Sequence, residues 1–168
     1  MATEVLLPNA DSVNNWDAGT FADVNQGVDT PNDSLLMTDG SNEGEIVTFD
    51  MDDSALADAD TITNVTIRTR AERGANDNDS LGIDLLIGGS VQGSQVDRTL
   101  PATFDDVDSN DVGWNSDWTA SQLDGLQVRL TTLQAAMPAV VDITVSEVEV
   151  VITYTPAAGD TLQSQVMM

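Results

Sequence analysis

The chain has 168 residues, with 29 Asp and Glu against 5 Lys and Arg, a formal net charge of −24, and no His or Cys. All five cations are Arg, so Lys is absent as well. This composition excludes Ser-His-Asp triads, Cys nucleophiles, Lys Schiff bases and His/Cys zinc sites. Carboxylate chemistry is the catalysis that remains, and we expect a binding or structural protein, not an enzyme.

Length and charge limit the organisation and the partners. A chain of this size fits one domain, and its 40% hydrophobic content is enough for a core. The negative surface repels phosphates, which disfavours nucleic acid and anionic membranes. An acidic, Lys-free surface is similar to that of proteins from halophilic or marine sources, and the alternative is simply a surface that resists aggregation. Residues 1–14 lack a basic region and a long apolar run, so we expect synthesis in the cytoplasm without a signal peptide or transmembrane segment.

Short alternating runs between clusters of Asp, Asn, Gly and Ser predict an all-β fold. We expect an antiparallel, jelly-roll-like β-sandwich of about eight strands over residues 15–155, with an N-terminal arm at 1–14 and a C-terminal tail at 156–168. The clear strands lie near residues 47–51, 61–73, 81–87, 126–130 and 143–154. Weaker strand candidates are 21–24, 35–38 and 99–104, and short helices are expected at 55–59 and 119–124, the second capped by Thr119.

The last strand changes parity within its own length. Ile143 and Val145 point to one face, whereas the apolar series that starts at Val148 has the opposite parity. A β-bulge near Ser146-Glu147 restores both groups to the core. Glu147 and Glu149 then face outward, where they are either solvated or paired across strands with Arg.

An acidic segment resembles a cation-binding loop. Side-chain oxygens recur at Asp106, Asp108 and Asn110, as in loops that wrap a hard cation. An EF-hand is rejected because Asp111 stands where Gly is required and the flanks are strand-like. A calcium site in a sandwich loop stays open beside the alternative of a solvated acidic turn. The same turn interpretation is favoured for residues 50–53 and 76–79.

Two tryptophans suggest a carbohydrate site. Trp114 and Trp118 flank a polar segment that includes Asp117, which combines stacking faces with hydrogen-bonding groups. The alternative, which we favour, is that each Trp closes one end of the sandwich. Glycoside hydrolysis would need two acids across a cleft, and the sequence singles out no such pair.

The C-terminal tail carries a small apolar cluster. This cluster consists of Leu162, Val166, Met167 and Met168. It is either a frayed end or an arm that docks on a neighbouring subunit.

Four stretches carry a family resemblance. They are WDAGTFADV at 16–24, ITNVTIR at 62–68, WTASQLDGLQV at 118–128 and VSEVEV at 145–150. Together they resemble small β-sandwich structural proteins of tailed phages and related viruses. The resemblance implies a virion accessory role, such as a capsid decoration (cement), tail or fibre protein, and it transfers no catalytic residue.

The expected partners follow from this role. They are capsid or other virion proteins and further copies of the chain, with location in the virion and no cofactor unless calcium is bound. The alternative is a carbohydrate-binding module of a tail fibre or adhesion protein, with or without calcium.

Overall fold

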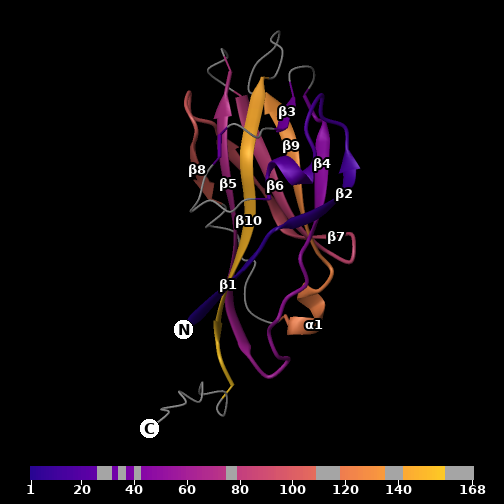
Figure 1. The fold of residues 1–168 in the computed structure, drawn as a ribbon, viewed down its shortest axis with the longest axis vertical. Helices are drawn as coiled ribbons and strands as arrows, with labels where there is room; N and C mark the ends of the chain where they lie inside the picture. Colours follow the sequence, from indigo (N-terminus) through magenta and orange to yellow (C-terminus); the bar gives the residue numbers. More distant parts are fainter. Residues whose placement is uncertain are drawn as a thin grey trace.

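The computed structural model describes residues 1–25, 32–33, 37–39, 43–74, 79–108, 118–134 and 142–157. Over these residues the chain is almost entirely β, which confirms the predicted fold class (Figure 1). The strands are β1 (Ala2–Leu6), β2 (Pro8–Asn14), β3 (Met37–Asp39), β4 (Ile46–Met51), β5 (Thr61–Arg73), β6 (Asp79–Ile87), β7 (Ser90–Thr99), β8 (Asp105–Asp108), β9 (Leu126–Gln134) and β10 (Ile143–Thr155). Two short helices accompany them, the 3-10 helix η1 (Phe21–Asp23) and α1 (Ala120–Leu123).

The strands form two antiparallel sheets with jelly-roll connectivity. One sheet, called sheet A here, has the order β1-β10-β5-β8, with β3 also paired to β10; the other, sheet B, has the order β2-β4-β9-β6-β7. Leaving out β2 and β3, the strands counted along the chain run first-eighth-third-sixth in sheet A and second-seventh-fourth-fifth in sheet B. This is the arrangement of two Greek keys in a jelly roll. The predicted eight-strand core is therefore present, with one additional strand on each sheet.

Alternating apolar residues build the core between the sheets. In β6 the inward series Leu81, Ile83 and Leu85 is fully buried, and Phe49 of β4 is buried on the same face of sheet B, in the row of Val128 and Leu85. The β6–β7 hairpin turns at Gly88 and Gly89, whose φ angles of 57° and 77° favour glycine. The sequence pattern therefore placed both the strand and its turn correctly.

Strand β10 contains the predicted bulge. Its register against β5 shifts between Val145 and Glu147, so Ser146 is the extra residue. Ile143 and Val145 before the shift, and Val148 after it, all lie in the core. A second shift, between Thr153 and Tyr154, was not expected from the sequence.

The N-terminal residues differ from the prediction. Residues 1–14 form β1 and β2 instead of a separate arm, and the chain passes from sheet A to sheet B around Leu7. The alternation in β1 is weak because its inward positions include Glu4, whose carboxylate accepts hydrogen bonds from Ser54 Oγ (2.6 Å) and Ala55 N (2.7 Å).

The predicted helix at 55–59 is absent. Besides the bond from Ala55 N to Glu4, the amide of Ala57 donates to Asp60 Oδ2 at 3.0 Å. Such local bonds between side chains and backbone compete with helix formation. The expected helix near 119–124 is confirmed as α1, where Thr119 N donates to Gln122 Oε1 at 2.9 Å.

Two weak strand predictions were wrong. Residues 21–24 enter η1 instead of a strand, with Asp23 Oδ2 accepting from Thr20 N at 2.9 Å. Residues 100–104 follow β7 without strand structure. The candidate at 35–38 overlaps β3, although residues 34–36 lie outside the described part. In the described part of the chain, no helix is long and apolar enough to cross a membrane.

Candidate functional sites

The predicted cation loop begins as a strand. Residues 105–108 form β8, which pairs with β5 so that Asp106 lies opposite Arg70 and Asp108 opposite Arg68. The Asp106 carboxylate lies 3.5 Å from Arg68 Nη2 and 3.7 Å from Arg70 Nη1. Its charge is thus already balanced by arginine. Asn110 lies outside the described residues, so the complete calcium proposal stays a prediction.

Arginines and acids alternate across the outer face of sheet A. The backbone register places Asp106, Arg70 and Glu147 in one row, and Asp108, Arg68 and Glu149 in the next. We call these two rows the charged ladder. Arg68 Nη1 donates to Glu149 Oε1 at 2.7 Å, as expected for a cross-strand partner. Both glutamates are nonetheless buried, at 0% and 2% exposure, so the expectation of a solvated face was wrong.

Residues 32–33 cover one end of the charged ladder. Asp33 binds Arg70 with two hydrogen bonds, 2.9 Å from Nε and 3.0 Å from Nη2, and its Oδ1 also accepts from Ser146 Oγ. The hydrogen bond from Arg70 lowers the pKa of Asp33 and raises that of Arg70. The ion pair between Asp33 and Arg70 therefore attaches residues 32–33 to this end of the charged ladder.

Glu147 is the most constrained acid of this group. Its Oε1 accepts from Asn32 N at 3.0 Å, whereas its buried Oε2 has no hydrogen-bond partner among the described residues. Burial raises the pKa of Glu147, against the opposing effects of the Asn32 hydrogen bond and the Arg70 charge. Because this buried carboxylate binds Asn32 N and lies near Arg70, it holds residues 32–33, called the covering segment here, and is not accessible to a ligand.

A second buried acid lies at the start of β6. Asp79 is fully buried, with Oδ2 accepting from Asp142 N at 3.0 Å and Oδ1 without a partner in the described part of the chain. Burial raises its pKa. Asp79 was assigned to a turn with residues 76–78, and those three residues lie outside the described part.

The predicted carbohydrate and interface residues are mostly outside the described part. Trp114, Asp117, Leu162, Val166, Met167 and Met168 all belong to this group. Trp118 is described and packs, partly buried, against the hydrophobic core. This position agrees with the structural interpretation of Trp118, and the stacking partnership with Trp114 stays untested.

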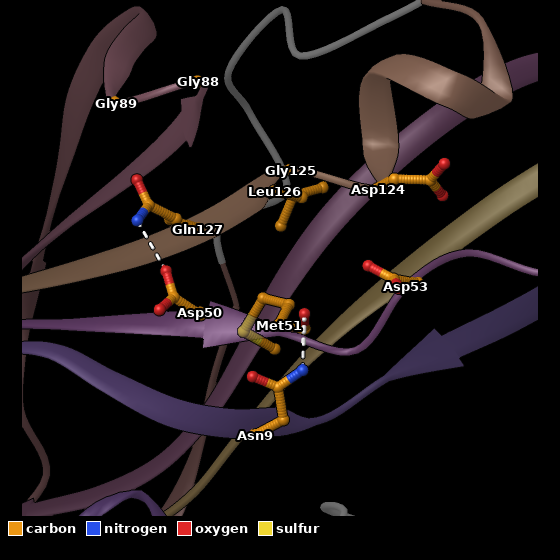
Figure 2. A pocket seen from close by; sticks show the side chains of 10 residues that line it. All are labelled: Asn9, Asp50, Met51, Asp53, Gly88, Gly89, Asp124, Gly125, Leu126 and Gln127. Atoms are coloured by element: carbon orange, nitrogen blue, oxygen red, sulfur yellow. Dashed lines mark hydrogen bonds between the residues drawn. The ribbon is translucent and has the colours of Figure 1, made fainter.

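A surface pocket of about 360 Å³ lies at one end of sheet B (Figure 2). Four segments line it: the start of β2, the end of β4, the β6–β7 turn and the α1–β9 connection. Its polar lining includes Asn9, Asp50, Asp53, Asp124 and Gln127. In Figure 2 the amide of Gln127 points to Asp50 and donates to it at 2.6 Å.

The floor of this pocket is apolar but small. Buried Met51 and Leu126 contribute to it, and Asn9 Nδ2 donates to the carbonyl of Met51 at 3.1 Å. The sequence did not single out this site, because its residues come from four separated segments. Its volume and mixed lining are within the range of small-ligand pockets.

No cofactor or metal centre is evident in the described ranges. Among those residues, no group of three or more His, Cys, Asp or Glu is placed to share a metal ion. No family model, curated protein or solved structure matches the chain. The family resemblance inferred from sequence therefore stays a prediction.

Proposed function

We propose that this protein is a non-enzymatic structural component of a virus particle, most simply a capsid decoration protein that binds to the assembled shell. The observation that carries the proposal is the jelly-roll strand order, because this architecture recurs in viral capsid proteins. The architecture links this chain to capsid proteins by fold analogy. The sequence resemblance over residues 16–155 points in the same direction.

The chemistry of the described side chains supports a passive role. Three arginines are held in ion pairs with acids of neighbouring strands or of the covering segment: Arg68 with Glu149, Arg70 with Asp33, and Arg129 with Asp84. The two acids with raised pKa, Asp79 and Glu147, are buried by protein and hydrogen-bonded to backbone amides. In this arrangement the carboxylates are enclosed within the sandwich, and the edges and outer faces are left for contacts with other subunits.

The high negative charge also suits a particle surface. A decoration protein is made free in solution and must stay soluble until it meets the shell, and a net charge of −24 opposes premature aggregation. Because exposed charges are screened over about 10 Å at 0.1 M salt, assembly of such a protein should depend on ionic strength.

The direct test is binding to particles. Shells made without this protein are mixed with the purified chain and sedimented through a density gradient at low and high salt. We expect saturable co-sedimentation with a fixed number of copies per shell, and the same chain in particles purified from the source. Absence from those particles, together with no co-sedimentation at any salt concentration, would refute the proposal.

A carbohydrate-binding module is the second candidate. It is favoured by the pocket in Figure 2, where amides and carboxylates lie beside a small apolar floor, since such groups bind sugar hydroxyls. A glycan array with and without calcium tests it, followed by calorimetry with Asp50→Asn and Gln127→Ala. Trp118→Ala tests the site predicted from sequence. Loss of binding in the pocket variants alone would place the ligand there, and no binding to any glycan would eliminate this candidate.

A further inference from the structure

The free edges of the two sheets are unequal in their protection against pairing with another chain. An unpaired strand edge is a template for a further strand, and proteins block such edges with prolines, bulges, charges or short length. The described edge strands are β1, β3 and β8 in sheet A, and β2 and β7 in sheet B. Their local features can therefore be compared directly.

Four of these edges carry a recognisable block. Strand β2 begins at Pro8 and has two register shifts against β4. Strand β7 has a register shift against β6, with Gly93 at a φ of 71° within the displaced segment. Strand β8 has three aspartates in four residues, and β3 is only three residues long.

Strand β1 has none of these features. Its register against β10 is continuous from Ala2 to Leu6, without a bulge or a proline. Its one charged side chain, Glu4, is bound by Ser54 and Ala55 of the same chain. The edge of β1 is therefore the one described edge that is regular and suited to adding a strand.

On the outer face beside β1, the two described rows that begin at Val5 and Thr3 contain no charged residue. The register places Val5, Val151 and Thr66 in one row, and Thr3, Thr153 and Asn64 in the next. We call these the uncharged rows. They continue the same sheet face directly below the charged ladder. Val5 is 50% exposed, one of the few large apolar side chains in the described part with such exposure.

We propose that the edge of β1 forms the contact with a second copy of this chain, in which the two β1 strands pair antiparallel about a two-fold axis and the uncharged rows of the two copies lie side by side on the continued sheet face. Two copies that each carry −24 repel one another, so an approach through an edge whose outer-face neighbours are uncharged costs the least. A two-fold axis also lets one strand satisfy its own edge, since the same residues occur on both sides. Sheet A then continues across the dimer.

This inference rests on the proposed role in assembly but is tested without particles. Sedimentation velocity is measured over a range of protein concentrations at about 0.1 and about 1 M NaCl, where the screening length falls from about 10 to about 3 Å. We expect a dimer, twice 17.8 kDa, that is at least about tenfold tighter at the higher salt concentration. Amide hydrogen exchange should slow in residues 2–6 as the dimer forms.

Matched variants locate the contact. Val5→Asp places like charges at the proposed interface, and Val91→Asp makes the same change on β7, where Val91 is 41% exposed. We expect Val5→Asp to weaken the dimer at least about tenfold and Val91→Asp to leave it within about twofold. Circular dichroism verifies folding, and Thr3→Asp, on the same exposed face, replaces Val5→Asp if that variant unfolds.

Several outcomes would overturn the proposal. A monomer at every salt and protein concentration would do so, as would equal effects of Val5→Asp and Val91→Asp. Exchange protection on another edge, with none in residues 2–6, would also contradict it. A monomer that still binds shells would refute the dimer while leaving the decoration role intact.

Discussion

The buried ion pair between Arg68 and Glu149 offers a quantitative test of how the outer face of sheet A is held. Glu149 is 2% exposed and its Oε1 lies 2.7 Å from Arg68 Nη1, whereas the Arg68 side chain keeps 25% exposure. Arg68→Met leaves the glutamate charge buried without this partner, a change that costs about 3 to 5 kcal/mol in proteins. Because water reaches the arginine side, we expect the lower end, about 3 kcal/mol. For a domain of this size that loss lowers Tm by about 6 to 12 °C.

The assay is thermal and urea unfolding of a double-mutant cycle. Arg68→Met/Glu149→Met removes both charges and should recover most of the loss, since a buried ion pair replaced by apolar side chains is often neutral in stability. Arg98→Met changes the net charge equally on the exposed β7 edge, where the guanidinium bonds to the Asp97 carbonyl at 3.4 Å, and it should cost less than about 1 kcal/mol because exposed pairs contribute little to stability. If Arg68→Met costs no more than Arg98→Met, or if the double variant shows the sum of two losses, this account of the pair is wrong.

Three further predictions concern pH, turn geometry and salt. Burial raises the pKa of Glu147 in the folded chain, so the fold binds this proton more tightly than the unfolded chain does, and the resulting stability is lost as pH rises through the folded pKa. Glu147→Gln should therefore raise Tm relative to the wild type, by more at pH 7 than near pH 4, and an equal difference at both would contradict the sign. Gly89→Ala should cost about 1 to 2 kcal/mol because its φ is 77°, whereas Gly125→Ala, which has only Gly88 N at 4.0 Å from the added Cβ, should be nearly neutral in urea unfolding. Raising NaCl from about 0.05 to about 0.5 M should increase the Tm of the wild type by screening its net charge, and a Tm that falls would show that local ion pairs outweigh the general repulsion.

The strands predictable from sequence are those with strict alternation of large apolar residues. Strand β6 has Leu81, Ile83 and Leu85 at every second position, and β10 shows both its length and the bulge at Ser146 through a change of parity. Strand β7 was not predicted because most of its side chains are polar. Its strand structure depends on pairing with β6. Strand β8 has one buried apolar residue, Val107, and is recognised only through its pairing with β5.

The candidate sites were less predictable because side-chain oxygens at alternate positions are compatible with two different structures. Side chains at alternate positions can surround a cation in a loop, but they also share one face of a strand. For Asp106 the structure supplies Arg68 and Arg70 on the neighbouring strand, which sequence spacing cannot show. The pocket was missed for a related reason, since Asn9, Asp50 and Gln127 meet only after three strands have paired in sheet B.

The outer face of sheet A shows how an acidic protein can combine solubility with assembly. In the charged ladder, Arg68 pairs with Asp106 and Glu149, and Arg70 pairs with Asp33 of the covering segment. These acids are therefore already bound within the fold. In the uncharged rows, Val5 and its neighbours need no such partners, and no charge in those rows has to be desolvated when another surface covers them. In the proposed dimer, long-range repulsion from the remaining acids limits the association rate, whereas the local contact sets the dissociation rate. For the proposed dimer, ionic strength should therefore control association, because it changes the first of these effects strongly and the second only weakly.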